Sequence, residues 1–428
     1  MYYLENYLGT LILLSFCSLI SAWEKHQDGT MITPFGVIAW PYAIIVSMIN
    51  LGGIYFGFFS VSLKSIVFVM LCLLFFLVGG RGIGMIFQYR KENKNVFFNP
   101  IEKLTELLDF YRPFFISIAI ISIVIGYINL YLSLDQNGWF FLASKEFEES
   151  YGKGLLAHIT LLNRPAIIFL FADYLIHKKK SILLLLILMF VTILILQIKN
   201  NIMTIILSCI YFGYFYSIMK LNIKKIIIYA LIIYGIFNIS YVIGFSRIGI
   251  VNAYSFKVQH YLLNQFFTYL FGGPIGFSEI LTDPTYPLYQ FDAIFAVPFN
   301  LYNTIIGNPD LVNVIFYHWI PVSNIYQYFH LSNVFGIFGM LYMYIGPYAT
   351  WIYMFLLGTS IYYIRFLAFK KNAFIGFQLI YVFMISYLTI SFFGLYFNIL
   401  IVHEASFFMF MMPFLYLLFR RLIRMIHM

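Results

Sequence analysis

The chain has 428 residues, of which 62% are hydrophobic, 21% aromatic and only 10% charged, and its formal net charge is +9. Soluble domains carry about 25% charged residues, so this composition excludes an ordinary soluble protein and indicates a chain dissolved in a lipid bilayer. Inside lipid each apolar run must satisfy its own backbone hydrogen bonds, which predicts an all-α, polytopic membrane protein and not a barrel of short alternating strands.

The placement of the basic residues and of the cysteines argues against three further kinds of protein: nucleic-acid binders, disulfide-rich domains and proteins with a cysteine metal site. Most Lys and Arg residues stand in short connectors between apolar runs, as the positive-inside rule describes, so nucleic-acid binding is not expected. Cys17, Cys72 and Cys209 lie within apolar runs without metal-site spacing, so neither a disulfide framework nor a cysteine metal site is expected.

About eleven membrane spans follow one another along the chain, or ten to twelve if one run is split or re-entrant. No basic residue precedes the first run, so it is interpreted as a span and not as a cleaved signal peptide. The expected spans cover residues 7–22, 35–59, 65–87, 113–134, 158–176, 181–198, 202–219, 226–246, 333–363, 373–395 and 398–419. The whole chain, 1–428, is predicted to form a single membrane domain.

Two local features stand out between these spans. Gly79, Gly80, Gly82 and Gly84 end the third span and predict close helix packing or a break. Residues 90–112 carry leucines on one side and charges on the other, which predicts an amphipathic interfacial helix.

The basic clusters agree with one alternating topology. Five of them fall on the cytoplasmic side if the segments 90–112, 178–180, 220–225, 365–371 and 420–424 are placed there. The connector 135–157 then becomes a smaller external loop, and the segment 247–332, between the eighth and ninth spans, becomes one large external loop. Eleven spans would put the N-terminus outside, and ten or twelve would put it inside.

The large loop holds most candidates for chemistry. Arg247 ends the eighth span, and Arg164 lies near the outer end of the fifth. Guanidinium groups bind phosphate oxygens in a bidentate way, so these two could clamp a lipid pyrophosphate, although both could simply extend to ordinary headgroups.

Candidate bases also lie in the loop. Any of His260, His318 and His330 could accept a proton near neutral pH, although a hydrogen-bonded interfacial histidine is the commoner role. The other polar candidates are Lys257, Glu279, Asp283, Asp292 and Tyr326, the last within an aromatic-rich stretch that suits sugar stacking or an interfacial belt. His403-Glu404, in the last hairpin, is expected to satisfy itself inside the bundle, with a role near the site as the alternative. No Asp-x-Asp pair, Walker loop or dinucleotide fingerprint occurs, so neither a metal nor a cofactor is expected.

The layout resembles that of bacterial O-antigen and capsule repeat-unit polymerases of the Wzy type. Three short signatures accompany the layout: Thr33-Pro34 with Trp40, Arg247 followed by 269–274, and Asn324-Ile325-Tyr326 followed by 333–339. Gln327 stands where that family often has Thr, and Asn333-Val334 where it often has Asp.

The resemblance implies a metal-independent glycosyltransferase of the bacterial cytoplasmic (inner) membrane, with an architecture like that of the GT-C-type polymerases and ligases. It would transfer undecaprenyl-pyrophosphate-linked glycan en bloc onto a new lipid-linked repeat at the outer face, and a chain-length regulator would be a further partner. In that reading Arg247, with Arg164 as second choice, stabilises the leaving pyrophosphate. Two alternatives stay open: an O-antigen ligase, and a lipid-linked oligosaccharide flippase or other transporter.

Overall fold

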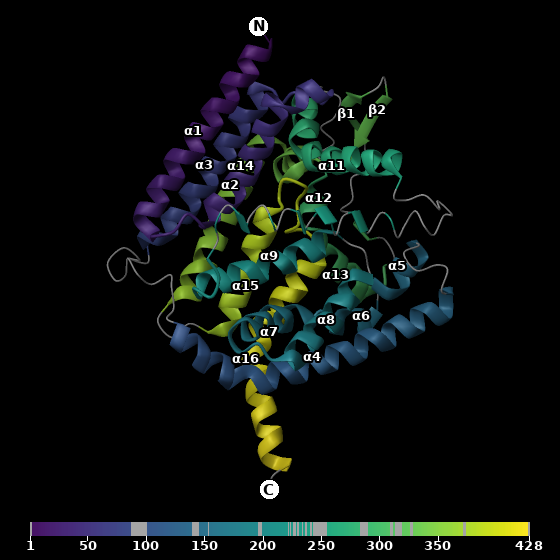
Figure 1. Cartoon of the computed structure of the whole chain (residues 1–428). Coiled ribbons are helices and arrows are strands. Elements are labelled where there is room, and N and C mark those ends of the chain that lie inside the picture. Colours follow the sequence, from purple (N-terminus) through teal and green to yellow (C-terminus); the bar gives the residue numbers. More distant parts are fainter. Residues whose placement is uncertain are drawn as a thin grey trace. The chain divides into compact units, whose positions relative to one another are not determined.

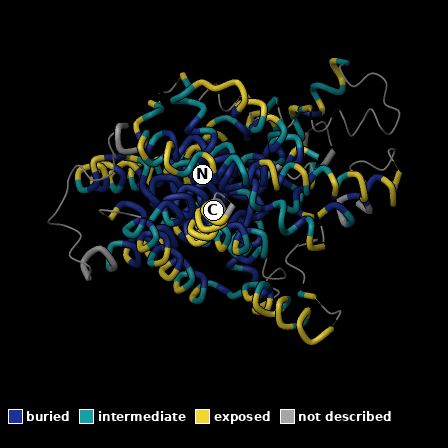
Figure 2. The backbone as a smooth tube through the Cα atoms, turned by 90° about the horizontal axis from the view of Figure 1, so that it is seen from below, coloured by how far each residue is buried: buried dark blue, intermediate teal, exposed yellow. Residues whose placement is uncertain are grey.

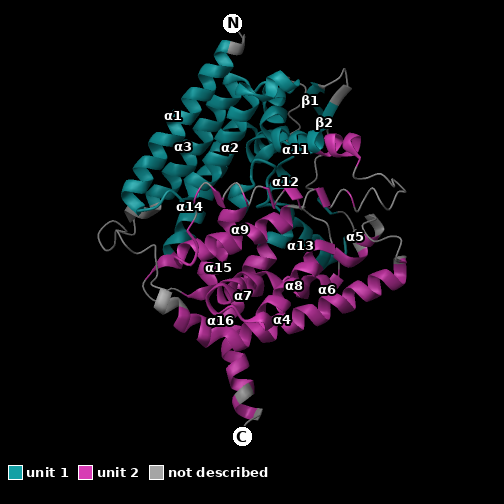
Figure 3. Ribbon diagram, viewed as in Figure 1, with its two compact units in different colours: residues 1–97, 263–366, 387–402 teal, residues 98–262, 367–386, 403–428 magenta. Residues whose placement is uncertain are grey.

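The computed structural model describes residues 2–86, 101–138, 145–152, 154–195, 199–220, 255–282, 290–308, 311–312, 319–325, 328–370 and 374–426, and isolated residues between 222 and 242. The chain divides into two compact units (Figure 3). Unit 1 comprises residues 1–97, 263–366 and 387–402, and unit 2 comprises residues 98–262, 367–386 and 403–428. Each unit is thus assembled from three separate stretches of chain. The single domain expected over 1–428 stays a prediction.

Unit 1 contains the N-terminal helices and most of the segment expected as the large loop (Figure 1). Its elements are α1 (Tyr2–Asp28), α2 (Pro34–Leu51), the 3-10 helix η1 (Gly53–Phe56), α3 (Leu63–Ile86), most of α11 (Phe256–Thr282), α12 (Phe291–Ile294), α13 (Ala296–Ile306), β1 (Ile320–Ile325), β2 (Tyr328–Ser332) and most of α14 (Gly336–Phe369).

Every described secondary-structure element of unit 2 is a helix. Its elements are α4 (Ile101–Asn137), α5 (Lys145–Gly152), α6 (Gly154–Thr160), α7 (Asn163–His177), α8 (Lys180–Ile195), α9 (Lys199–Phe215), the start of α11, most of α15 (Ile375–Thr389) and most of α16 (Leu400–Ile426).

The described helices bear out a polytopic membrane protein. Seven of them are long and apolar enough to cross a bilayer. Their spanning portions are Leu4–Asp28, Pro34–Leu51, Leu63–Gly82, Thr105–Gln136, Gly154–His177, Gly336–Phe369 and Leu400–Leu422. Three further expected spans correspond to α8, α9 and α15, which are apolar but shorter, and the expected eighth span, 226–246, lies largely outside the described residues.

Apolar side chains on the exposed helix faces support the same conclusion. Leu4, Leu8, Leu11 and Leu19 of α1 are all exposed, whereas Leu13 and Cys17 of the same helix are fully buried. Figure 2 shows such exposed and buried stretches alternating along individual helices. A soluble protein would place polar residues on the exposed stripe, so the solvent of these faces is lipid.

Glycines allow α3 and α14 to approach closely, as their sequence predicts. A Cβ on Gly79 would lie 2.1 Å from the carbonyl oxygen of Phe355, and a Cβ on Gly358 would lie 2.0 Å from that of Phe76. Both distances are far below van der Waals contact. The two backbones therefore touch at reciprocal glycines, the device by which membrane helices pack without a side chain between them.

Two features differ from the sequence expectations. Residues 101–112 are not a separate interfacial helix: α4 runs without interruption from Ile101 to Asn137, and Leu108 is fully buried. Burial of that leucine against neighbouring helices outweighs its attraction to the interface, and Pro113 does not end the helix. The fold also contains an antiparallel hairpin, β1–β2, within the segment expected as the large loop.

Candidate functional site

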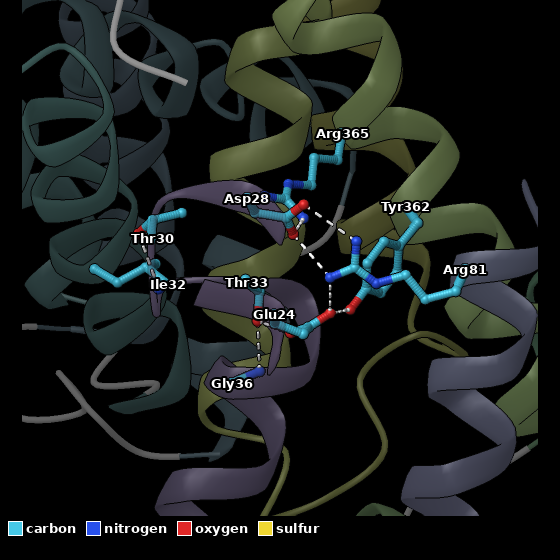
Figure 4. Close-up of polar contacts among 9 residues, drawn as sticks. All are labelled: Glu24, Asp28, Thr30, Ile32, Thr33, Gly36, Arg81, Tyr362 and Arg365. Atoms are coloured by element: carbon cyan, nitrogen blue, oxygen red, sulfur yellow. Dashed lines mark hydrogen bonds and ion pairs between the residues drawn. The ribbon is translucent and has the colours of Figure 1, made fainter. Parts of the chain in front are cut away.

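A buried ionic network joins three helices of unit 1 (Figure 4). Asp28, the last residue of α1, accepts hydrogen bonds from both terminal nitrogens of Arg81 on α3, at 3.1 and 2.8 Å, and from Nη1 of Arg365 on α14, at 2.8 Å. Glu24, one turn earlier on α1, accepts from Arg81 and from the hydroxyl of Tyr362. Glu24 is 0% exposed and Asp28 3% exposed, so each carboxylate depends on these donors for its stability.

The same network fixes the entry into α2. Thr33 donates its hydroxyl proton to Glu24 and accepts a hydrogen bond from the backbone N–H of Gly36 at 3.0 Å. Thr33 is therefore the N-cap of α2, and Pro34 occupies the first helical position, where its missing N–H costs nothing. Two carboxylates face two guanidinium groups, so the network balances its formal charge and is suited to locking helices together.

A second ionic cluster lies in unit 2, between α4 and α7. Arg112 donates hydrogen bonds to the fully buried carboxylate of Asp173 from Nε at 2.9 Å and from Nη2 at 2.7 Å. Nδ1 of His177 lies 2.8 Å from the same carboxylate. Asp109 contacts Arg112 at 2.7 Å from one turn earlier. The fork of Arg112 is occupied by acids, which makes this cluster another connection between helices and not an anion site.

A further polar pair lies in unit 2, and only one of its two residues, Glu404, was singled out from the sequence. Nδ1 of His158, on α6, lies 3.0 Å from both carboxylate oxygens of Glu404, near the start of α16. The expectation that His403 and Glu404 satisfy each other was therefore incomplete, since Glu404 bonds to His158. The two are 246 residues apart, and nothing in their spacing reveals that their helices are neighbours.

The structure places several of the sequence-predicted site residues in unit 2. Arg164, near the start of α7, is only 4% exposed, and its guanidinium carbon lies 5.9 Å from the ring centroid of Phe383. Lys257 and His260 occupy the first turns of α11, where the ring of His260 lies 6.2 Å from that of Phe256.

Glu279, Asp292 and His330 belong to unit 1. Glu279 is near the end of α11, Asp292 caps the backbone N–H of Ala293 in α12, and His330 stands on β2 opposite Ser323. Partial burial lowers the pKa of His330 below its ordinary value. His330 is therefore neutral near pH 7, the state in which an imidazole can accept a proton.

The hairpin that carries His330 is tied to the segment before α3. The backbone N–H of Phe59 donates to the carbonyl of Val322 at 3.0 Å, and that of Asn324 donates to Gly57 at 2.9 Å. The hairpin is therefore extended by main-chain bonds from residues 57–59. Ser278 of α11 adds a further tie, because its hydroxyl accepts from the N–H of Ser62 at 2.9 Å.

Four predicted residues, Arg247, Asp283, His318 and Tyr326, lie outside the described residues. The remaining candidates are divided between the two units: Arg164, Lys257 and His260 in one, Glu279, Asp292 and His330 in the other. Among the described residues, no group of three or more His, Cys, Asp or Glu side chains could hold a metal ion.

Comparison with known proteins gives one match. Residues 57–424 match a family whose description is "Family of unknown function (DUF6337)". No curated protein matches the chain, and no solved structure matches it.

Proposed function

Because the chain belongs to this family of unknown function, we propose a role from its own residues and architecture: it is a multi-pass glycan polymerase of the bacterial cytoplasmic membrane. It would transfer a lipid-pyrophosphate-linked oligosaccharide onto a new lipid-linked repeat unit at the outer face. The observation that carries the proposal is the β1–β2 hairpin, tied to residues 57–59 at one end of unit 1, opposite the end that holds the ionic network.

The two ends of unit 1 follow from the course of its helices. Residues 57–62, tied to the hairpin, lead directly into α3, and Arg81 lies about 18 residues further on, roughly 27 Å along the helix. The hairpin likewise leads into α14, whose far end carries Arg365. The hairpin and the ionic network are thus separated by about the thickness of a bilayer core.

The positive-inside rule then orients the unit. Lys370 and Lys371 follow α14 directly, which favours a cytoplasmic position for the network end and an outer position for the hairpin. Asn6, near the start of α1, donates to the hydroxyl of Ser60 at 2.8 Å, so the N-terminus lies at the hairpin end. This arrangement supports an external N-terminus and hence an odd number of spans.

Unit 2, taken by itself, also has a basic end. α7 ends at His177, next to Lys178, Lys179 and Lys180, and Arg420 of α16 lies 5.6 Å from the ring of Phe110 on α4. These basic groups favour the cytoplasmic side.

The proposed reaction is a displacement at the anomeric carbon of the donor sugar. The acceptor hydroxyl forms the new glycosidic bond, the bond to the pyrophosphate oxygen breaks, and its electron pair leaves with the lipid pyrophosphate. A base takes the hydroxyl proton, and cationic donors stabilise the charge on the leaving group. Arg247 is the proposed cation. His330, which is neutral at physiological pH and lies among the residues that the structure describes, is a candidate for the base. His260, His318 and the loop carboxylates remain the other candidates. Since both substrates are held in one membrane, the bilayer supplies proximity.

A strain that lacks the protein tests the proposal. It should display single repeat units on its lipid anchor and lose the long glycan ladder on a gel, and Arg247→Ala should reproduce this result at normal protein level in the membrane. Arg424→Ala, which changes an arginine at the end of α16, is the matched control and should retain the ladder. A complete ladder in the null strain would exclude the polymerase.

One observation favours a second candidate, a transporter of lipid-linked oligosaccharide. α14 is broken at Gly346, whose φ of 73° and ψ of 179° are not helical, and Pro347 follows. Interrupted helices are typical of transporters near the middle of the membrane. That function predicts repeat units trapped at the inner face of the null strain, whereas an O-antigen ligase predicts a lipid core without any repeat.

A further inference from the structure

The His158–Glu404 pair is built as an oriented histidine. Nδ1 of His158 lies within hydrogen-bond distance of both oxygens of the Glu404 carboxylate. A carboxylate can only accept, so this contact holds the proton on Nδ1 and leaves Nε2 as the acceptor nitrogen. Among the described residues none bonds to Nε2.

Exposure and position make this nitrogen accessible. The side chain of His158 is 44% exposed and that of Glu404 24%. His158, on α6, lies near the start of the candidate span Gly154–His177, and His177, at the basic end of α7, closes that span. Glu404 likewise stands near the start of α16, whose arginines lie at the other end. The pair therefore occupies the end of unit 2 opposite its basic clusters.

This arrangement differs from the two other ionic clusters. In those, the buried carboxylates of Asp28 and Asp173 face guanidinium groups, and Asp173 is shared between Arg112 and the imidazole of His177. Here the carboxylate faces a partly exposed imidazole, and a base oriented by a second group is the arrangement used for proton abstraction in catalysis.

We propose that His158 and Glu404 form a proton-accepting dyad for the transferase, an inference that rests on the proposed function. Nε2 of His158 takes the proton of the acceptor sugar hydroxyl as the hydroxyl oxygen bonds to the anomeric carbon of the donor. The carbon–oxygen bond to the lipid pyrophosphate breaks, and its electron pair departs with the pyrophosphate. Glu404 is a positioning residue, because it acts by holding the imidazole and stabilising its protonated form.

The test uses cells that express the full chain, with glycan polymerisation followed by pulse-labelling and gel analysis. His158→Gln keeps a side chain that can donate to Glu404 but removes the basic nitrogen, so polymerisation should fall about 100-fold or more. Glu404→Gln should cause a smaller fall. His403→Gln, in the residue next to Glu404, is the matched control and should retain polymerisation.

Chemical rescue separates catalysis from a purely structural role. In His158→Ala, imidazole added to the medium should restore part of the ladder, and it should have no effect on the Arg247→Ala variant. A His158→Gln strain with a full ladder, or a His158→Ala strain that imidazole does not rescue at normal protein level, would overturn the dyad. A null strain with an unchanged ladder would instead overturn the proposed function, so the two failures are distinct.

Discussion

Asp28 shows what a buried charge requires inside a membrane protein. It lies between Arg81 and Arg365 and depends on both for its negative charge. Removing one partner from such a network leaves an uncompensated ion, whose desolvation is not offset, whereas exposed charges contribute little.

We therefore expect Asp28→Asn to destabilise the protein by about 3–5 kcal/mol. The same neutralisation in Glu5→Gln, at an exposed position of the same helix, should change stability by less than about 0.5 kcal/mol. Unfolding temperatures of the purified protein in detergent measure both. Equal temperatures for Asp28→Asn and the unaltered protein would contradict the role of the network.

His330 makes stability depend on pH in a definite direction. Because burial lowers its pKa, the unfolded chain takes up the proton at a higher pH than the folded chain does. The contribution of His330 to stability is thus complete above its ordinary value, about 6.5, and declines as the pH falls toward the lowered value. Unfolding temperatures at pH 7.5 and pH 5.5 should differ less for His330→Gln than for the unaltered protein. An identical difference would show that this imidazole does not titrate in that range.

At the scale of the element, the break in α14 depends on glycine. The backbone of Gly346, with φ of 73° and ψ of 179°, lies in a region that is essentially restricted to glycine. Pro347 has no N–H to donate, so the break leaves one hydrogen bond fewer to satisfy. The hydroxyl of Thr350, one turn further on, donates to the carbonyl of Gly346 at 2.7 Å.

Gly346→Ala should therefore cost about 1–3 kcal/mol through strain. Gly82→Ala is the matched control, because a Cβ at Gly82 meets no atom within 4 Å and alanine favours the helix. Thermal unfolding of the two variants in detergent should give a lowered temperature for the first and an unchanged or raised one for the second. Two unchanged temperatures would mean that α14 can straighten at this point.

The positions of the membrane helices could be predicted from the sequence, but the contacts between those helices could not. Apolar run length identified the helices on which the seven long spans lie, since lipid leaves the backbone no alternative to a helix. The β1–β2 hairpin was missed because Tyr326-Gln327 between its strands lacks the glycine or asparagine typical of tight hairpins. The pairing of Asp28 with Arg365 and of His158 with Glu404 depends on which helices are neighbours, and spacing along the chain does not carry that information.

At the scale of the whole molecule, the proposed orientation makes a direct prediction about labelling. The three native cysteines are all buried and should react little with a labelling reagent, so the label should report an introduced cysteine. Asn324→Cys on β1 should react with a membrane-impermeant maleimide in intact spheroplasts, and Lys370→Cys, after α14, should react only once the membrane is opened. The reverse pattern would place the hairpin in the cytoplasm and exclude the proposed outer site.

The discontinuous make-up of unit 1 has a consequence for biosynthesis. Asp28 and Arg365 are 337 residues apart, and a ribosome needs on the order of 20–70 s to translate that interval. During this time Glu24 and Asp28 share the single cation of Arg81, and the nascent N-terminal helices hold one acidic charge too many. Truncated chains that stop before residue 365 would keep that excess permanently, which would mark them as unfinished to a protease that samples polar groups within the bilayer.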